Sequence, residues 1–347
     1  MPSSNRRTLL VLGVLTGALV LCGCTGGGGT DGTGGTREAR PDPDLPLRAR
    51  AVATTDTLLA DYDAVLAGPG AAQADRLRTF RADLAAHRTA LASGLPSPAG
   101  STSPAGTPSG SGSAAGGAVP PSTRPTGSAV NSVAALATAE RQAAGARLAD
   151  LDTASPALAK LLAAVSASDA LHAAALGDTG PITVPAPAPS SSARAAASGP
   201  AVSKSPAPLP GASAAALQNA LAAEHAAVYG YGVVGAWLPA GEQRQDAYAT
   251  YAVHEAERDG WQRLLGAGGA TPTAAAPGYR LPFQVTDAAT AGRLAAHVET
   301  QLTGVYADLV AATTGPLRDR AATALRDTAL RATHWGADLS ALPGLPG

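Results

Sequence analysis

Charged side chains stand at apolar positions in the C-terminal half of the chain, where they could bind a metal or neutralise one another. Glu224 recurs with leucines and a valine at steps of three and four residues, the spacing of a buried helix face. Glu299 holds the same kind of position further along the chain. A carboxylate costs several kcal/mol to bury unless it is paired or bound to a metal. We therefore expect both glutamates to have partners, and the candidates are His254, Arg258, Arg331 and His334.

The N-terminal half carries a comparable set of acids and histidines. Asp169 and His172 are three residues apart on one apolar face, and His87 lies on another between leucines. Asp61 and Glu140 could face them from neighbouring helices. Nitrogen and oxygen ligands at this spacing suit iron, manganese or zinc. Buried histidine–carboxylate pairs that stabilise an alanine-rich bundle would give the same pattern, and both interpretations stay open.

These side chains need helices to position them, and the apolar periodicity predicts helices in both halves. Each half has a short turn, then a long connection, then a short turn, which is the loop pattern of a four-helix bundle with one crossover, as in ferritin-like folds. The expected fold class is all-α, with two such bundles in tandem joined by disordered linkers. The predicted helices are Leu47 to Leu66, Ala71 to Ala92, Ala129 to Asp152, Pro156 to Leu176, Ser213 to Leu238, Asp246 to Leu265, Ala288 to Ala312 and Pro316 to Leu342.

Stretches rich in Pro, Ser, Gly and Ala mark the predicted boundaries, because they cannot bury enough apolar surface to offset chain entropy. The predicted parts are a signal peptide at 1–23, a lipid-anchored flexible tether at 24–46, an N-terminal helical bundle at 47–177 interrupted by a disordered segment at 97–126, a Pro/Ala/Ser-rich linker at 178–212 and a ferritin-like domain at 213–347.

The two halves align at their acidic positions. Asp61 corresponds to Glu224, and Glu140 corresponds to Glu299, while each half has a histidine in its second helix. Matching loop rhythm and acid positions favour an internal duplication. Alanine-rich helices also match one another by chance, so this alternative stays open.

The N-terminus predicts export and a lipid anchor. Arg6 and Arg7 precede an apolar run from Leu9 to Leu21 that is shorter than the roughly 20 residues a membrane-spanning helix needs. The residues around Cys24 resemble the lipobox of bacterial lipoproteins, in which the cysteine is acylated and becomes the new N-terminus. We expect a protein held by this lipid on the outer face of the cytoplasmic membrane.

Composition excludes several classes of function. The chain has 2 Cys, both near the predicted cleavage site, so the mature protein has no thiolate metal site or cysteine nucleophile. A net charge of −1 argues against a nucleic-acid partner, which would need a basic face. The chain also lacks a Gly-x-Ser-x-Gly elbow, a phosphate loop and a dinucleotide-binding glycine motif.

The C-terminal half is similar to a known domain. The segment from Leu221 to Gly232, His254 with Arg258, the segment from Tyr279 to Asp287, and Glu299 resemble a ferritin-like domain of unknown function found in actinobacterial lipoproteins and secreted proteins. The resemblance covers about residues 213–345. It implies the bundle fold and an extracytoplasmic location, and it implies no established activity.

The wider ferritin-like superfamily binds two metals through one Glu from each of two helices and a Glu-x-x-His from each of the other two. Tyr251 and Arg331 stand where the acids of the two Glu-x-x-His motifs belong. This departure favours a vestigial site in which arginines neutralise the acids. A single ion held by Glu224, His254, Glu299 and His334 is the alternative.

The expected function is that of a cell-surface lipoprotein with non-catalytic bundles in a binding or structural role, with no resident cofactor. The alternative is a metal-binding oxidase or iron-handling protein of the di-metal carboxylate type. The ligand, any protein partner and the oligomeric state stay open.

Overall fold

The structure is a computed structural model that describes residues 42–68, 73–95, 130–185 and 208–346. Parts of the predicted organisation lie outside the described residues: the signal peptide, Cys24, most of the tether, the segment at 97–126 and residues 186–207 of the linker.

All regular structure in the described residues is α-helical, which confirms the all-α fold class. A helix lies at each position where the sequence predicts one. The helices are Asp44–Ala67 (α1), Ala74–Ala92 (α2), Val133–Leu148 (α3), Pro156–Ala175 (α4), Gly211–Trp237 (α5), Glu242–Ala267 (α6), Ala288–Ala312 (α7) and Gly315–His334 (α8).

Local side-chain contacts set several helix ends. The side chain of Ser155 caps α4 by accepting from Leu158 N, and proline follows in the first turn. Asp287 and Thr290 form a reciprocal capping box at the start of α7. The first helix begins inside the predicted tether, which is expected to reach residue 46. Helix α1 starts at Asp44, whose carboxylate accepts from the backbone and hydroxyl of Ser155.

The last helix is shorter than predicted. The sequence predicts a helix to Leu342, but α8 ends at His334. Gly336 adopts a φ of 84°, in the left-handed region that favours glycine and ends a helix. The remaining residues therefore form a tail rather than two more helical turns.

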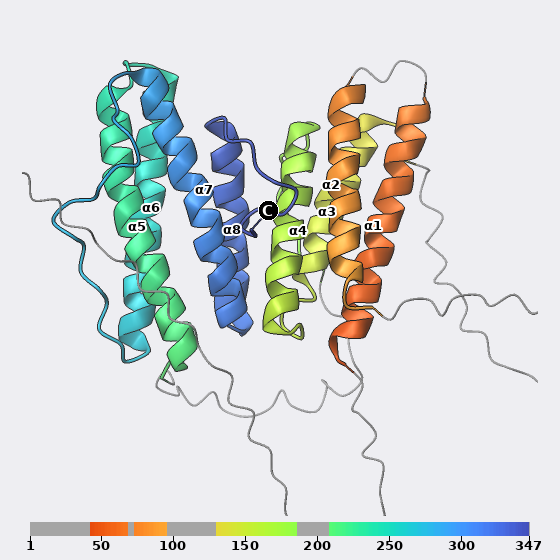
Figure 1. Ribbon diagram of the computed structural model, residues 1–347, viewed down its shortest axis with the longest axis horizontal. Coiled ribbons are helices and arrows are strands. Elements are labelled where there is room, and N and C mark those ends of the chain that lie inside the picture. The colour runs from red at the N-terminus through yellow and green to blue at the C-terminus, as the bar shows by residue number, and fades with distance from the viewer. Residues whose placement is uncertain (1–41, 69–72, 96–129, 186–207, 347) are drawn as a thin grey trace, which may run out of the picture. The chain divides into compact units, whose positions relative to one another are not determined.

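The C-terminal half has the connectivity expected from its loops. Short turns join α5 to α6 and α7 to α8, and residues 268–287 run along the bundle from the end of α6 to the start of α7 (Figure 1). Helix α5 packs against α6 and α7, and α7 packs against α8. In the N-terminal half α1 packs against α2 and α3, and α4 packs against α3 and α2.

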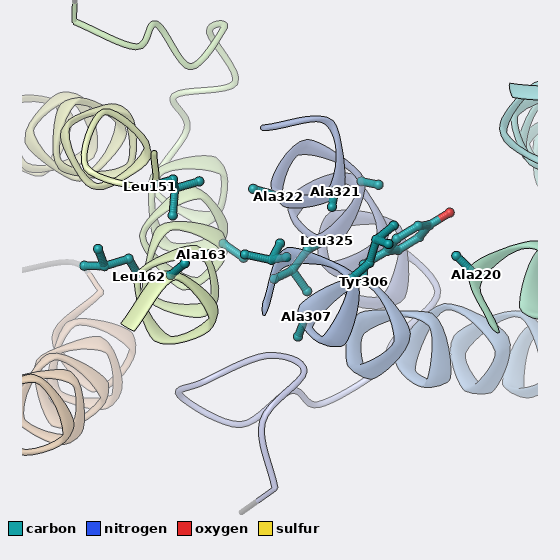
Figure 2. Packing of buried hydrophobic residues seen from close by; sticks show 14 of the residues in the cluster. Leu151, Leu162, Ala163, Ala220, Tyr306, Ala307, Ala321, Ala322 and Leu325 are labelled. Atoms are coloured by element: carbon teal, nitrogen blue, oxygen red, sulfur yellow. The ribbon is translucent and has the colours of Figure 1, made fainter. Parts of the chain in front are cut away.

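The halves share a core, which the sequence did not predict. Helix α4 packs against α7 and α8, and Figure 2 shows Leu325 of α8 on the side of that helix that faces Ala163 of α4. Arg318 is buried at this contact, where its Nη1 donates to the carbonyl oxygens of Leu151 at 2.6 Å and Ala154 at 3.0 Å. The described helices therefore form one compact unit.

Helix α4 is central to this unit. It is long and apolar enough to cross a membrane by length and composition, but 72% of its apolar window is buried inside the protein. Leucine, valine and alanine are buried around most of its circumference. Packing between α3 on one side and α7 and α8 on the other accounts for its composition.

Candidate functional site

The predicted polar residues of the C-terminal half meet as a buried chain of three groups from three helices. Glu224 of α5, His254 of α6 and Glu299 of α7 are each 0% exposed. His254 Nδ1 lies 2.8 Å from Glu224 Oε2, and its Nε2 lies 3.1 Å from Glu299 Oε1. Burial opposes a charge on the ring, but the hydrogen bonds and charges of the two carboxylates raise the pKa of His254 to about 9. Both ring nitrogens then donate, as only a protonated imidazole can.

A tyrosine closes each end of this chain. The hydroxyl of Tyr306 donates to Glu224 Oε1, and that of Tyr231 donates to Glu299 Oε1 at 2.7 Å. Burial and the neighbouring carboxylate raise the pKa of each phenol well above its usual value. The hydroxyls therefore stay protonated and remain donors.

Arg331 supplies the second positive charge. Its Nε donates to Glu299 Oε1 at 3.0 Å, and its Nη2 donates to Thr328 Oγ1 at 3.0 Å. Burial alone would raise the pKa of Glu299, but the hydrogen bond from His254 and the charge of Arg331 lower it. Two carboxylates thus face two cations, so the cluster is formally neutral.

Two candidate partners do not reach this cluster. His334 is exposed at the end of α8, where its Nε2 lies 3.2 Å from Asp246 Oδ2, so the prediction that it joins the buried acids is wrong. His334 is the last residue of α8, and its side chain is 60% exposed. Arg258 pairs instead with Asp259 at 2.9 Å and Glu255 at 3.5 Å on its own helix.

The N-terminal half contains a second buried cluster around His172. Its Nδ1 lies 3.1 Å from Glu140 Oε1, and its Nε2 lies 3.3 Å from Asp83 Oδ2. The hydroxyl of Tyr62 also donates to Glu140 Oε1, at 2.8 Å. Burial opposes the ring's charge, but the carboxylates raise the pKa of His172 to about 9. Burial raises the pKa of Glu140, although the charge and hydrogen bond of His172 act to lower it.

The other predicted residues of the N-terminal half do not join the cluster around His172: Asp169 pairs with an arginine, and His87 binds a backbone carbonyl oxygen. Arg147 Nε donates to Asp169 Oδ2 at 2.5 Å. His87 Nε2 donates to the carbonyl oxygen of Ala341 in the C-terminal tail at 2.6 Å, and burial lowers the pKa of this histidine to about 4. With its proton on Nε2, the neutral ring presents a lone pair to Asp169 Oδ1 at 3.7 Å, too far for a hydrogen bond. Asp61 is buried on α1, one residue before Tyr62.

The two halves share one local arrangement. In each half, a tyrosine of the first helix and a basic side chain of the fourth contact the same glutamate oxygen of the third helix. The histidines of the second helices differ. His254 bridges two carboxylates, whereas His87 binds the carbonyl oxygen of Ala341 in the C-terminal tail. The equivalent groups are Tyr62, Glu140 and His172 in one half and Tyr231, Glu299 and Arg331 in the other.

A metal fits these groups poorly. In the described part of the chain, no group of three or more His, Cys, Asp or Glu side chains is placed to hold a metal ion. Glu299 Oε1 already accepts from Tyr231, His254 and Arg331. A divalent cation there would face a guanidinium, just as one at Asp169 would face Arg147. The chemistry that the clusters support is internal charge pairing.

Sequence reasoning missed several partners. Tyr231 and Tyr306 each follow a buried glutamate by seven residues, and two helical turns return a side chain to the same face. Arg147 follows Glu140 at the same distance. This spacing is a signal that could have identified all three. Asp83 is half-buried beside Leu84 on α2, and its position did not identify it as a partner of His172.

Comparisons with known proteins place the similarity in the C-terminal region. A family model described as a domain of unknown function (DUF4439) matches residues 216–347. A crystal structure of a conserved hypothetical protein, rv2844, from Mycobacterium tuberculosis matches at 42% identity, over 36% of this chain and 94% of that chain, with a TM-score of 0.35. No curated protein matches the sequence. The C-terminal region of the chain, residues 216–347, therefore carries a DUF4439 domain.

Proposed function

We propose that the protein is an envelope lipoprotein, which acylated Cys24 holds on the outer face of the cytoplasmic membrane. Its helical halves are ferritin-like bundles that have a binding or structural role and no catalysis of their own. The lipobox-like sequence at Cys24 supports the anchor. The short, long, short connectivity of α5–α8 supports the ferritin-like bundle.

The observation that carries the non-catalytic role is the neutralisation of the C-terminal acids by the protein itself. Glu224, His254 and Glu299 are fully buried, and the two carboxylates accept from His254, Arg331 and two tyrosine hydroxyls. A carboxylate that acts as a base or metal ligand needs a position open to substrate or ion. Arg331 pairs with Oε1 of Glu299, so a cation at this carboxylate would face a guanidinium.

Elemental analysis tests this proposal. The chain from residue 24, carrying Cys24→Ala so that it has no acyl group, would be exposed to iron, manganese and zinc and then desalted. We expect no stoichiometric metal and no change in melting temperature, because an ion that bound the folded state would stabilise it. Stoichiometric metal with a raised melting temperature would support the oxidase or iron-handling alternative.

A further inference from the structure

An apolar pocket lies on the outside of the C-terminal half, away from the buried acids. Its volume is about 190 Å³, and apolar atoms make up most of its lining. One wall is formed by small residues of α5, the opposite wall by aliphatic residues of α7, and the third by residues 279–282 of the crossover. The residues facing each other across it are Ala223, Ala226 and Gly230 of α5 and Leu294, Val298 and Val305 of α7.

The small residues of α5 leave room for the pocket. A Cβ added at Gly230 would lie 3.1 Å from Val298 Cγ2, so any larger residue there would narrow it. The rings of Tyr229 and Tyr279 are 5.5 Å apart and both border the pocket. The hydroxyl of Tyr279 accepts from Ala276 N at 3.1 Å, a contact within the crossover segment.

The rim of the pocket is polar and carries one cation, Arg280. Arg280, His297 and Gln301 border it, and no acidic side chain is among its lining residues. Arg280 is exposed and makes no ion pair or side-chain hydrogen bond within the described ranges. A cation without a protein partner beside an apolar pocket is complementary to a ligand with an anionic end and an apolar body.

We propose that this pocket binds a free fatty acid of medium chain length, with the alkyl chain between α5 and α7 and the carboxylate at Arg280. A dry apolar cavity of about 150 Å³ holds a benzene molecule, so a pocket of this volume holds a chain only somewhat larger. The proposal is independent of the buried clusters: metal in the bundle would overturn the non-catalytic role and leave the pocket unaffected.

Calorimetric titration with butanoate, hexanoate, octanoate and decanoate tests the proposal, using the chain from residue 24 with Cys24→Ala. Affinity should rise about fourfold per added methylene and then level off between octanoate and decanoate, where the pocket is full. Octylamine should bind more weakly than octanoate. Equal affinity along the series, no binding, or binding only to phospholipid vesicles would overturn it.

Matched variants locate the site. Ala226→Leu fills the pocket from α5 and should abolish octanoate binding, whereas Ala222→Leu places the same side chain on the exposed face of α5 and should not. Arg280→Gln should weaken octanoate binding about threefold and remove the preference over octylamine, while the exposed Arg263→Gln on α6 should do neither. Circular dichroism checks that each variant is folded. Octanoate binding at the parent's affinity by folded Ala226→Leu would also overturn the proposal.

Discussion

At the scale of single residues, the buried clusters show how a bundle with few aromatic residues tolerates acids in its core. Each glutamate accepts from a phenol that stays protonated and from at least one basic group. His254 contributes because it holds a proton between two carboxylates. The cluster's stabilising effect therefore depends on the charge of one imidazole.

Stability should consequently depend on pH through His254. Its pKa is about 9 in the folded state against 6.5 for an ordinary histidine, so its stabilising contribution is fully present below about pH 6.5 and is lost as pH rises through about 9. Between pH 6 and pH 9, the free energy of urea unfolding should fall more for the parent than for His254→Gln. The exposed His334→Gln should behave as the parent does; an identical pH slope in His254→Gln would contradict the assignment.

At the scale of elements, periodicity predicts the helices and the faces that carry Glu224, His254 and Glu299, because burial follows the helical repeat. It does not predict helix ends that depend on tertiary contacts, such as the start of α1 at Asp44. It also does not predict that α4 lies between the halves, although the nearly all-round apolarity of α4 is the signal of a central helix.

The capping box of α7 makes a separate prediction. Asp287 accepts from Thr290 N at 2.7 Å and holds the first turn of the helix that carries Glu299. Asp287→Ala should lower the free energy of unfolding by about 1 kcal/mol. Asp308→Ala, which removes an exposed acid later in α7, is the control and should cost less. Equal losses in urea unfolding would mean that the cap adds nothing beyond a surface charge.

At the scale of the whole molecule, the halves are joined by a packed face and by the buried Arg318. Its contacts with the carbonyl oxygens of Leu151 and Ala154 connect the start of α8 to the turn between α3 and α4. Both halves should therefore unfold together in one transition.

Removing this link should weaken the coupling between the halves. Arg318→Ala leaves three buried hydrogen bonds to carbonyl oxygens without their donor and should cost about 3 kcal/mol, with the halves unfolding more separately in calorimetry. Lys160→Ala breaks the exposed cross-half pair with Asp308 and should cost under about 1 kcal/mol. A single unchanged transition in Arg318→Ala would show that the halves are not coupled through this residue.

The proposed lipid anchor makes a prediction for the whole protein in the cell. Cys24→Ala removes the thiol that the lipobox-like sequence presents for acylation, so the protein should leave the membrane fraction and keep its signal uncleaved by the lipoprotein pathway. Fractionation and N-terminal mass measurement check this. A membrane-bound variant with a processed N-terminus would contradict the lipid anchor.

The most direct test of the central claim is a double-mutant cycle at Arg331 and Glu299, measured by urea unfolding with and without iron, manganese or zinc. Arg331→Ala should cost about 3 kcal/mol, because it leaves a buried carboxylate with less positive charge, and adding Glu299→Gln should recover part of that loss. Arg258→Ala, whose parent side chain is similarly exposed but contacts no buried acid, should cost under about 1 kcal/mol. The account predicts that metal changes none of these values. Metal-dependent recovery of Arg331→Ala, or an Arg331→Ala variant as stable as the parent, would contradict it.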